Sequence, residues 1–168
     1  TDLEMFGSYP QSIIKIKDSP TAYYSIFHKA SPVINNVNIH DLVIDHNAAN
    51  DVASTVTYAR CTLFIDGSNM RFHHNWVKNM DGYAGADFNG TSTENVEITD
   101  NLFTNIGVAG TPASHDASIV YVDKKSGATA LIRGNRFYAG IDGYLYGART
   151  AIETHGSNNI VAENFISG

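Results

Sequence analysis

One eight-residue pattern recurs five times along the chain, and it constrains the fold more than any other feature. The pattern reads apolar, any residue, apolar, two polar or small residues, Asn, any residue, apolar. Its copies span residues 37–44, 70–77, 96–103, 130–137 and 159–166. A recurring unit of this kind is typical of solenoids, in which each repeat buries its apolar side chains against its neighbours.

The third and eighth positions of the pattern are apolar in every copy, although the distance between copies varies. The third position is filled by Ile39, Phe72, Ile98, Ile132 and Val161, and the eighth by Ile44, Val77, Phe103, Phe137 and Ile166. A propeller or a helical repeat would keep a more regular period. The variable spacing instead predicts a strand–turn–strand core whose coils carry loop insertions on one side.

The sixth position predicts a ladder of amide side chains. It is Leu42 in the first copy and Asn in the other four, Asn75, Asn101, Asn135 and Asn164. Successive coils of a β-solenoid stack about 4.8 Å apart, so equivalent residues form columns. Because Asn suits sharp bends and tolerates a left-handed backbone, we interpret this column as structural.

A second strand is predicted before each of the last four copies, at residues 63–66, 86–89, 120–123 and 152–155. Alternation points one set of side chains into the core and the other set outward. The inward set is Leu63, Ile65, Ala86, Phe88, Val120, Val122, Ile152 and Thr154. One outward column should contain Phe64, Asp87, Tyr121 and Glu153, and the next Asp66, Asn89, Asp123 and His155.

Composition and charge exclude several classes of protein. The 17 acidic and 11 basic residues leave a net charge of −6, which argues against a nucleic-acid partner. No apolar run approaches the ~20 residues of a membrane-spanning helix, so we expect no membrane span. The single cysteine, Cys61, excludes an intrachain disulfide framework. We expect one domain over residues 1–168, truncated at both ends, because bare solenoid ends expose unpaired strands.

The repeat, of the type N-V-x-I-x-x-N-x-F, resembles that of the pectate-lyase-like superfamily over roughly residues 13–168. The resemblance implies an all-β, right-handed parallel β-helix, with about five to seven coils in this chain. It also implies a polysaccharide partner, an extracellular location or a place on a phage tail, and a homotrimer of the tailspike type. Four apolar side chains are predicted to point outward, where a trimer interface or a longer chain would bury them; these are Phe64, Trp76, Leu102 and Phe165.

Four carboxylates, those of Asp66, Asp87, Asp123 and Glu153, should share the outward face of the second strands. The strand spacing puts Asp87 and Glu153 roughly 9.6 Å apart and Asp123 and Glu153 about 8 Å apart. Inverting glycosidases hold their two carboxyl groups about 6.5–9.5 Å apart, and retaining ones about 5–5.5 Å. Clustered acids also repel, which raises the pKa of at least one of them and keeps a general acid protonated.

These distances favour hydrolysis by paired acids. We predict Asp87, Asp123 and Glu153 as catalytic residues, with His155 tuning or replacing one partner. Substrate should be bound by further polar and aromatic groups, because tyrosine rings stack on sugars and amides bond to hydroxyls. These are Asp66, Asn89, Tyr121 and, on the long connections at 104–117 and 138–149, Tyr144, Tyr146 and Arg149. Solvated surface acids without a function are the alternative.

Other activities stay open. A lyase of the resembled superfamily would need calcium, held by Asp66, Asp87 and Asp123, and a cationic base. The candidate bases are Lys124, Lys125, Arg133 and Arg149. A faint echo of an alginate-epimerase motif lies at 82–88. Apart from calcium in a lyase we expect no cofactor. The alternative of a different class is a non-catalytic tailspike or a glycan-binding structural segment.

Histidines and acids should also meet at the bends of the repeat. His40 and His73 share one column, and Asp41, His74 and Asp100 share another. A histidine between two acids could bind a metal ion. We favour hydrogen-bonded turn histidines and predict no metal site here.

Overall fold

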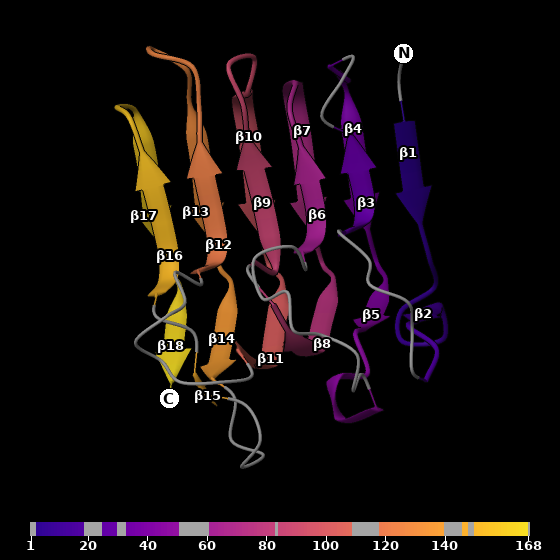
Figure 1. Ribbon diagram of the computed structural model, residues 1–168. Coiled ribbons are helices and arrows are strands. Elements are labelled where there is room, and N and C mark those ends of the chain that lie inside the picture. The colour runs from indigo at the N-terminus through magenta and orange to yellow at the C-terminus, as the bar shows by residue number, and fades with distance from the viewer. Residues whose placement is uncertain are drawn as a thin grey trace.

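The computed structural model describes residues 3–18, 25–29, 33–50, 61–82, 84–108, 118–139, 146–147 and 150–167. Its strands form three parallel sheets stacked as a β-solenoid, with successive coils side by side from the N-terminal to the C-terminal end (Figure 1). The one helical element among these residues is the short 3-10 helix η1 (Ala48–Asn50). No helix in this part of the chain is long and apolar enough to cross a membrane.

Each described coil contributes one strand to sheet A and one to sheet B, and every coil before the last also contributes one to sheet C. Sheet A contains, in spatial order, β1 (Leu3–Phe6), β4 (Val37–His40), β7 (Ser68–His73), β10 (Glu94–Thr99), β13 (Ala130–Arg133) and β17 (Asn159–Ala162). Sheet B contains β2 (Ile13–Lys15), β5 (Val43–Asp45), β8 (Trp76–Asp81), β11 (Leu102–Val108), β14 (Arg136–Ala139) and β18 (Phe165–Ser167). Sheet C contains β3 (Ser25–Lys29), β6 (Cys61–Ile65), β9 (Ala86–Asn89), β12 (Ser118–Asp123) and β16 (Thr150–His155). One short strand, β15 (Tyr146–Gly147), pairs antiparallel with β11.

The strand register confirms the predicted repeat. Each copy of the eight-residue pattern is a sheet A strand, a tight bend and a sheet B strand. In sheet A the third-position residues pair in one column, running Ile39, Phe72, Ile98, Ile132 and Val161. In sheet C, Ile65 pairs with Phe88 and Phe88 with Val122, as predicted for inward positions.

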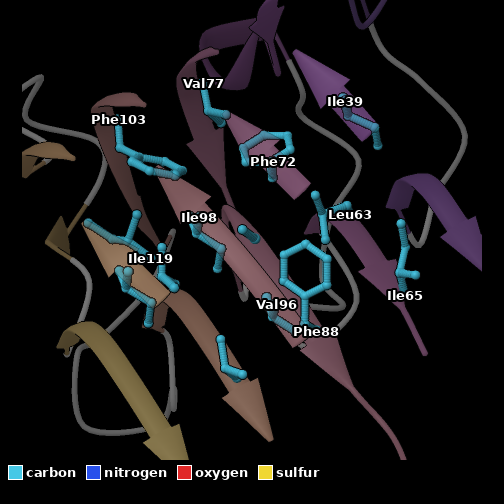
Figure 2. Close-up of a cluster of buried hydrophobic side chains, with 14 of the residues drawn as sticks. Ile39, Leu63, Ile65, Phe72, Val77, Phe88, Val96, Ile98, Phe103 and Ile119 are labelled. Atoms are coloured by element: carbon cyan, nitrogen blue, oxygen red, sulfur yellow. The ribbon is translucent and has the colours of Figure 1, made fainter. Parts of the chain in front are cut away.

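The inward columns of the three sheets form one continuous apolar core (Figure 2). Phe72, Phe88, Phe103 and Phe137 are among its largest fully buried side chains. The rings of Phe103 and Phe137 stack with centroids 5.1 Å apart and planes 3° from parallel. Full burial of a side chain of this size contributes roughly 1.5–3 kcal/mol, so these columns stabilise the stacking of coils.

The last copy of the repeat occupies the same columns but is more exposed. Val161 and Ile166 are 50% and 60% exposed, because β17 and β18 are edge strands of their sheets. Ile152 and Thr154 of β16 are half-buried for the same reason.

The predicted asparagine ladder is present at the bend between sheets A and B. The Oδ1 atom of Asn101 accepts hydrogen bonds from the backbone N–H and the Nδ2 of Asn75, at 3.0 and 3.2 Å. The Nδ2 of Asn101 donates to the Phe72 carbonyl at 2.8 Å and to Asn135 Oδ1 at 3.0 Å. Asn135 repeats the arrangement toward Asn164. Every donor and acceptor of the Asn101 amide is therefore used within a buried column.

The left-handed residue of this bend is not the ladder asparagine, which corrects the prediction. It is the residue before it, with φ of 57° at Asp41, 54° at His74 and 56° at Asp100. None of the four ladder asparagines has a positive φ, whereas the residue before each of them does. The tight reversal therefore falls on that neighbour, and the asparagine amide stays in the column of hydrogen bonds.

Two further asparagine ladders mark the other corners of the coil, and the repeat analysis missed them. Before sheet A, Asn69 Nδ2 donates to Asn36 Oδ1 and Asn95 Nδ2 to Asn69 Oδ1, both at 3.0 Å. After sheet B, Asn105 Nδ2 donates to Asn79 Oδ1 at 3.0 Å. All five have φ between 53° and 57°. The signal was an Asn directly before the first position of the pattern in four of the five copies, at Asn36, Asn69, Asn95 and Asn158.

The ladder predicts a selective loss of stability. Asn101→Ala or Asn135→Ala should lower the free energy of unfolding by about 1–3 kcal/mol, since buried backbone partners lose their bonds. Asn35→Ala is the control, because Asn35 is exposed and water can replace its bond to Ser68. Urea denaturation of the three variants measures the difference. Equal and negligible effects at all three sites would contradict the ladder's stabilising role.

Candidate functional site

The outward face of sheet C brings the predicted residues into register. Asp87 in β9 pairs with Phe64 in β6 and with Tyr121 in β12, and Tyr121 pairs with Glu153 in β16. In the neighbouring column Asn89 pairs with Asp123, and Asp123 with His155. Both predicted columns are thus formed; Asp66 lies one residue beyond the end of β6.

Asp87 is buried, although its position on the outward face predicted a solvated side chain. The residue is only 1% exposed, and its Oδ1 has no hydrogen-bond partner among the residues that the structure describes. Burial, and then the charge of nearby Asp123, raises the pKa of Asp87 to about 7. A buried carboxylate without partners is costly, so the protonated form is favoured well above the usual range.

Asp123 lies at the edge of a hollow of about 370 Å³ at the carboxyl end of sheet C. Asn89, Gly90, Thr91 and Lys125 also line this hollow. Asp123 is half-buried, and it is diagonal to Asp87 across adjacent strands, which corresponds to about 8 Å between their backbones. It is therefore close enough to influence the proton affinity of Asp87 while remaining open to solvent.

Glu153 is held by two neighbours. Ser118 Oγ donates a hydrogen bond to its Oε2 at 2.5 Å, and His155 Nε2 lies 3.0 Å from its Oε1. The His155 ring in turn contacts the Tyr121 ring, with centroids 5.3 Å apart. Glu153 is two strands from Asp87 in the same column, roughly 9.6 Å by the strand spacing. Both oxygens of its carboxylate are thus oriented.

Ser118 was not predicted from the sequence as a residue of this site. No pattern marks this residue, because its contact with Glu153 joins two strands that are 35 residues apart in the chain. Only the register of β12 against β16 brings the hydroxyl to the carboxylate.

The Asp66 carboxylate is engaged by the turn that follows β9. Its Oδ1 accepts hydrogen bonds from the Ser92 backbone N–H at 3.0 Å and from Thr93 Oγ1 at 3.2 Å. Gly90 packs so closely that a side chain there would meet the Asp66 carboxylate. The geometry therefore gives Asp66 a role in stabilising the turn beside the site; its role in binding substrate stays a prediction.

The predicted loop residues lie mostly outside the described part of the chain. This is true of Tyr144 and Arg149, and Tyr146 is described only by its backbone pairing in β15. The connection expected at 104–117 begins later than predicted, because β11 continues to Val108. Likewise β14 occupies residues 136–139, at the start of the second expected connection.

Three of the four candidate cationic bases have other partners. Lys124 is buried, and its Nζ donates to the carbonyl oxygens of His155, at 3.3 Å, and of Ser157. Lys125 Nζ lies 3.5 Å from Glu94, and Arg133 Nε lies 3.6 Å from Glu163. Arg149 lies outside the described residues. Within those residues no three His, Cys, Asp or Glu side chains are grouped closely enough to hold a metal ion.

The bend histidines form a hydrogen-bonded stack on sheet A. His40 and His73 stack with ring centroids 4.7 Å apart. His40 Nδ1 lies 2.7 Å from the Asp41 carboxylate, and His73 Nε2 lies 2.9 Å from Asn38 Oδ1. Burial, and then the neighbouring His40, lowers the pKa of His73. A neutral ring stacked on a second imidazole explains this cluster without a ligand.

No family model matches this chain, and no curated protein and no solved structure matches it either. The fold and the site therefore define its class by themselves. It is a parallel β-solenoid protein with a buried, protonatable carboxyl group on the outer face of one sheet.

The raised pKa of Asp87 predicts how stability depends on pH. The folded state binds this proton more tightly than the unfolded chain, whose Asp pKa is near 3.8. Stability should therefore fall as the pH rises from about 4 to about 7 and level off above, by on the order of 4 kcal/mol. Asp87→Asn should remove this decline, which denaturation at a series of pH values will measure.

Two control variants separate Asp87 from other titrating groups. Asp123→Asn should reduce the decline only in part, because burial remains the larger cause of the shift. Asp100→Asn, at an exposed bend, should leave it unchanged. An Asp87→Asn variant with the same pH profile as the wild type would show that this carboxyl titrates normally.

Proposed function

We propose that this chain hydrolyses glycosidic bonds in a polysaccharide bound across the outer face of sheet C, with Asp87 as the general acid. The observation that carries the proposal is the state of Asp87: buried, with an unpartnered Oδ1 and a pKa of about 7, on a face that also holds Asp123 and Glu153. Such a group keeps its proton near neutral pH and can deliver it. The resemblance of the repeat to pectate-lyase-like proteins agrees with this class of substrate.

Each acid has a separate role in the proposed reaction. Asp87 is 1% exposed, so this reaction requires that substrate binding opens access to its carboxyl group. Asp87 then gives its proton to the oxygen of the scissile bond as the bond to the anomeric carbon breaks. Glu153 takes a proton from a water molecule, which attacks that carbon from the opposite side of the ring. The strand spacing puts their backbones roughly 9.6 Å apart, just above the range of about 6.5–9.5 Å between the carboxyl groups of inverting pairs, which leaves room for this water. Asp123 maintains the proton on Asp87 through its charge.

Ser118 and His155 are positioning residues in this scheme. They hold the two oxygens of Glu153, at 2.5 and 3.0 Å, so that one carboxylate orientation is favoured. His155 is the more exposed of the two partners and contacts Tyr121, whose ring can also stack on a sugar. A base whose orientation is held in this way needs less reorganisation when substrate binds.

Hydrolysis is favoured over elimination because the described cationic side chains that could act as a base, Lys124, Lys125 and Arg133, already have other partners. A lyase needs a basic side chain at the site, and Lys124 is buried with its ammonium group on two carbonyl oxygens. Calcium would enter only in this lyase alternative, with Asp66, Asp87 and Asp123 as its ligands. The second candidate function is a non-catalytic glycan-binding segment, for which the same face binds without cleaving. An extracellular or phage-tail location and a homotrimer remain proposals from the resemblance.

Glycan cleavage should depend on the two carboxyl groups. Asp87→Asn and Glu153→Gln should each reduce the release of reducing ends by about 10²–10⁴-fold, because each removes one member of an acid–base pair. The measurement is a reducing-end assay on a panel of polysaccharides, with product absorbance recorded for unsaturated ends. Asp100→Asn is the matched control on another corner, and Ser118→Ala should give an intermediate loss.

The pH profile gives a second test of the same assignment. Activity should decline above about pH 7 as Asp87 loses its proton, and Asp123→Asn should move this decline to lower pH. Unsaturated products would assign elimination instead. Wild-type protein that binds glycans without cleaving any would favour the glycan-binding alternative.

A further inference from the structure

The exposed asparagine ladder runs along the corner before sheet A and faces solvent. Asn69 and Asn95 are exposed, and their amides are linked to each other and to Asn36 at 3.0 Å. Thr129 Oγ1 continues the ladder by donating to Asn95 Oδ1 at 3.0 Å. A buried ladder is explained by stability, whereas this one presents a row of amides at the surface.

A groove lies beside this ladder, over the outer face of sheet A. It consists of two hollows, of about 330 and 770 Å³, which share Asn69, Asn95 and Glu97 as lining residues. The strand register places Arg71, Glu97, Leu131 and Ile160 in one column along its floor. The groove therefore crosses successive strands from β7 to β17, parallel to the ladder.

The groove offers hydrogen bonds and an apolar floor with no uncompensated charge. Within the ladder Asn69 uses one N–H and accepts one bond, which leaves it a second N–H and a second acceptor site. Arg71 Nε lies 3.1 Å from Glu97, so these two charges offset each other. Leu131 is half-buried, and Ile160 is 60% exposed. Such a surface suits a ligand with many hydroxyl groups, apolar C–H faces and no net charge.

The repeat distance of the groove points to a polymer. Its hydrogen-bonding side chains, Asn36, Asn69, Asn95 and Thr129, recur once per coil, about every 4.8 Å. One pyranose residue in an extended β-1,4-linked chain has nearly this length, so successive sugars can meet successive side chains of the ladder. An extended peptide repeats at about 3.3 Å and pairs along a strand edge rather than across a sheet face.

We propose that the sheet A groove is a second glycan site, which binds an extended, uncharged β-1,4-linked polysaccharide without cleaving it. The site is separate from sheet C, because the two faces belong to different sheets and share no residue. It extends the proposed function by a non-catalytic contact that holds the polymer on the solenoid. The binding stands on the groove alone and does not require hydrolysis at Asp87.

The test is titration of the protein with cellohexaose, xylohexaose and mannohexaose, with hexagalacturonate as the charged comparison. The readout is the ¹H–¹⁵N spectrum of the asparagine side chains and of the backbone amides of Glu97 and Leu131, which the double variant below retains. It is recorded for the wild type and for Asp87→Asn, which prevents cleavage during the experiment. The amide signals of Asn69 and Asn95 should shift with at least one neutral hexasaccharide. The double variant Asn69→Gly, Asn95→Gly should weaken this binding by about tenfold or more.

Glycine at these positions keeps the left-handed backbone and removes only the amide. Asn79→Gly is the matched control, since Asn79 has the same backbone conformation in the ladder after sheet B, away from the groove. If the wild type hydrolyses no glycan but the Asn69 and Asn95 signals still shift, the sheet A site is supported and the proposed function is not. The inference is overturned if no neutral hexasaccharide shifts these amides, if hexagalacturonate binds more tightly there, or if Asn79→Gly weakens binding as much as the double variant.

Discussion

The stacking of coils in this protein depends on amide hydrogen bonds at the corners. At the buried corner, Asn101 joins the coil before it to the coil after it through four hydrogen bonds, and Asn135 does the same one coil later. Because these amides are buried and their hydrogen bonds all lie within the column, a coil displaced along its strand would leave them unsatisfied. The corner therefore fixes the register of sheets A and B, and the apolar columns follow from it.

Register in turn determines which side chains can work together. Residues that are tens of positions apart in the chain, such as Asp87, Tyr121 and Glu153, become neighbours because each occupies the same step of its coil. The same rule aligns His40 with His73 and Asn69 with Asn95. A solenoid thus converts a periodic sequence into columns of like or interacting groups, and each sheet face acquires its own chemistry.

The outer faces of sheets C and A differ in their electrostatics, which determines the kind of ligand that each can bind. Sheet C holds a carboxyl whose burial raises its pKa, a strained electrostatic state that native structures retain chiefly at functional sites. Sheet A holds exposed amides and an offset ion pair, Arg71 and Glu97, which carry no such electrostatic cost. We interpret the first face as suited to chemistry and the second to holding a polymer.

Much of this fold could be read from residues 37–166, because side-chain period and turn chemistry are local properties. The strand columns, the Asn75–Asn164 ladder and the composition of the sheet C columns were all predicted. The left-handed position, one residue before each ladder asparagine, was assigned wrongly. The burial of Asp87 and the contact of Ser118 with Glu153 were not foreseeable, since alternation tells only which way a side chain points. Whether an outward position is covered, and which group reaches it from another coil, is decided by packing in three dimensions.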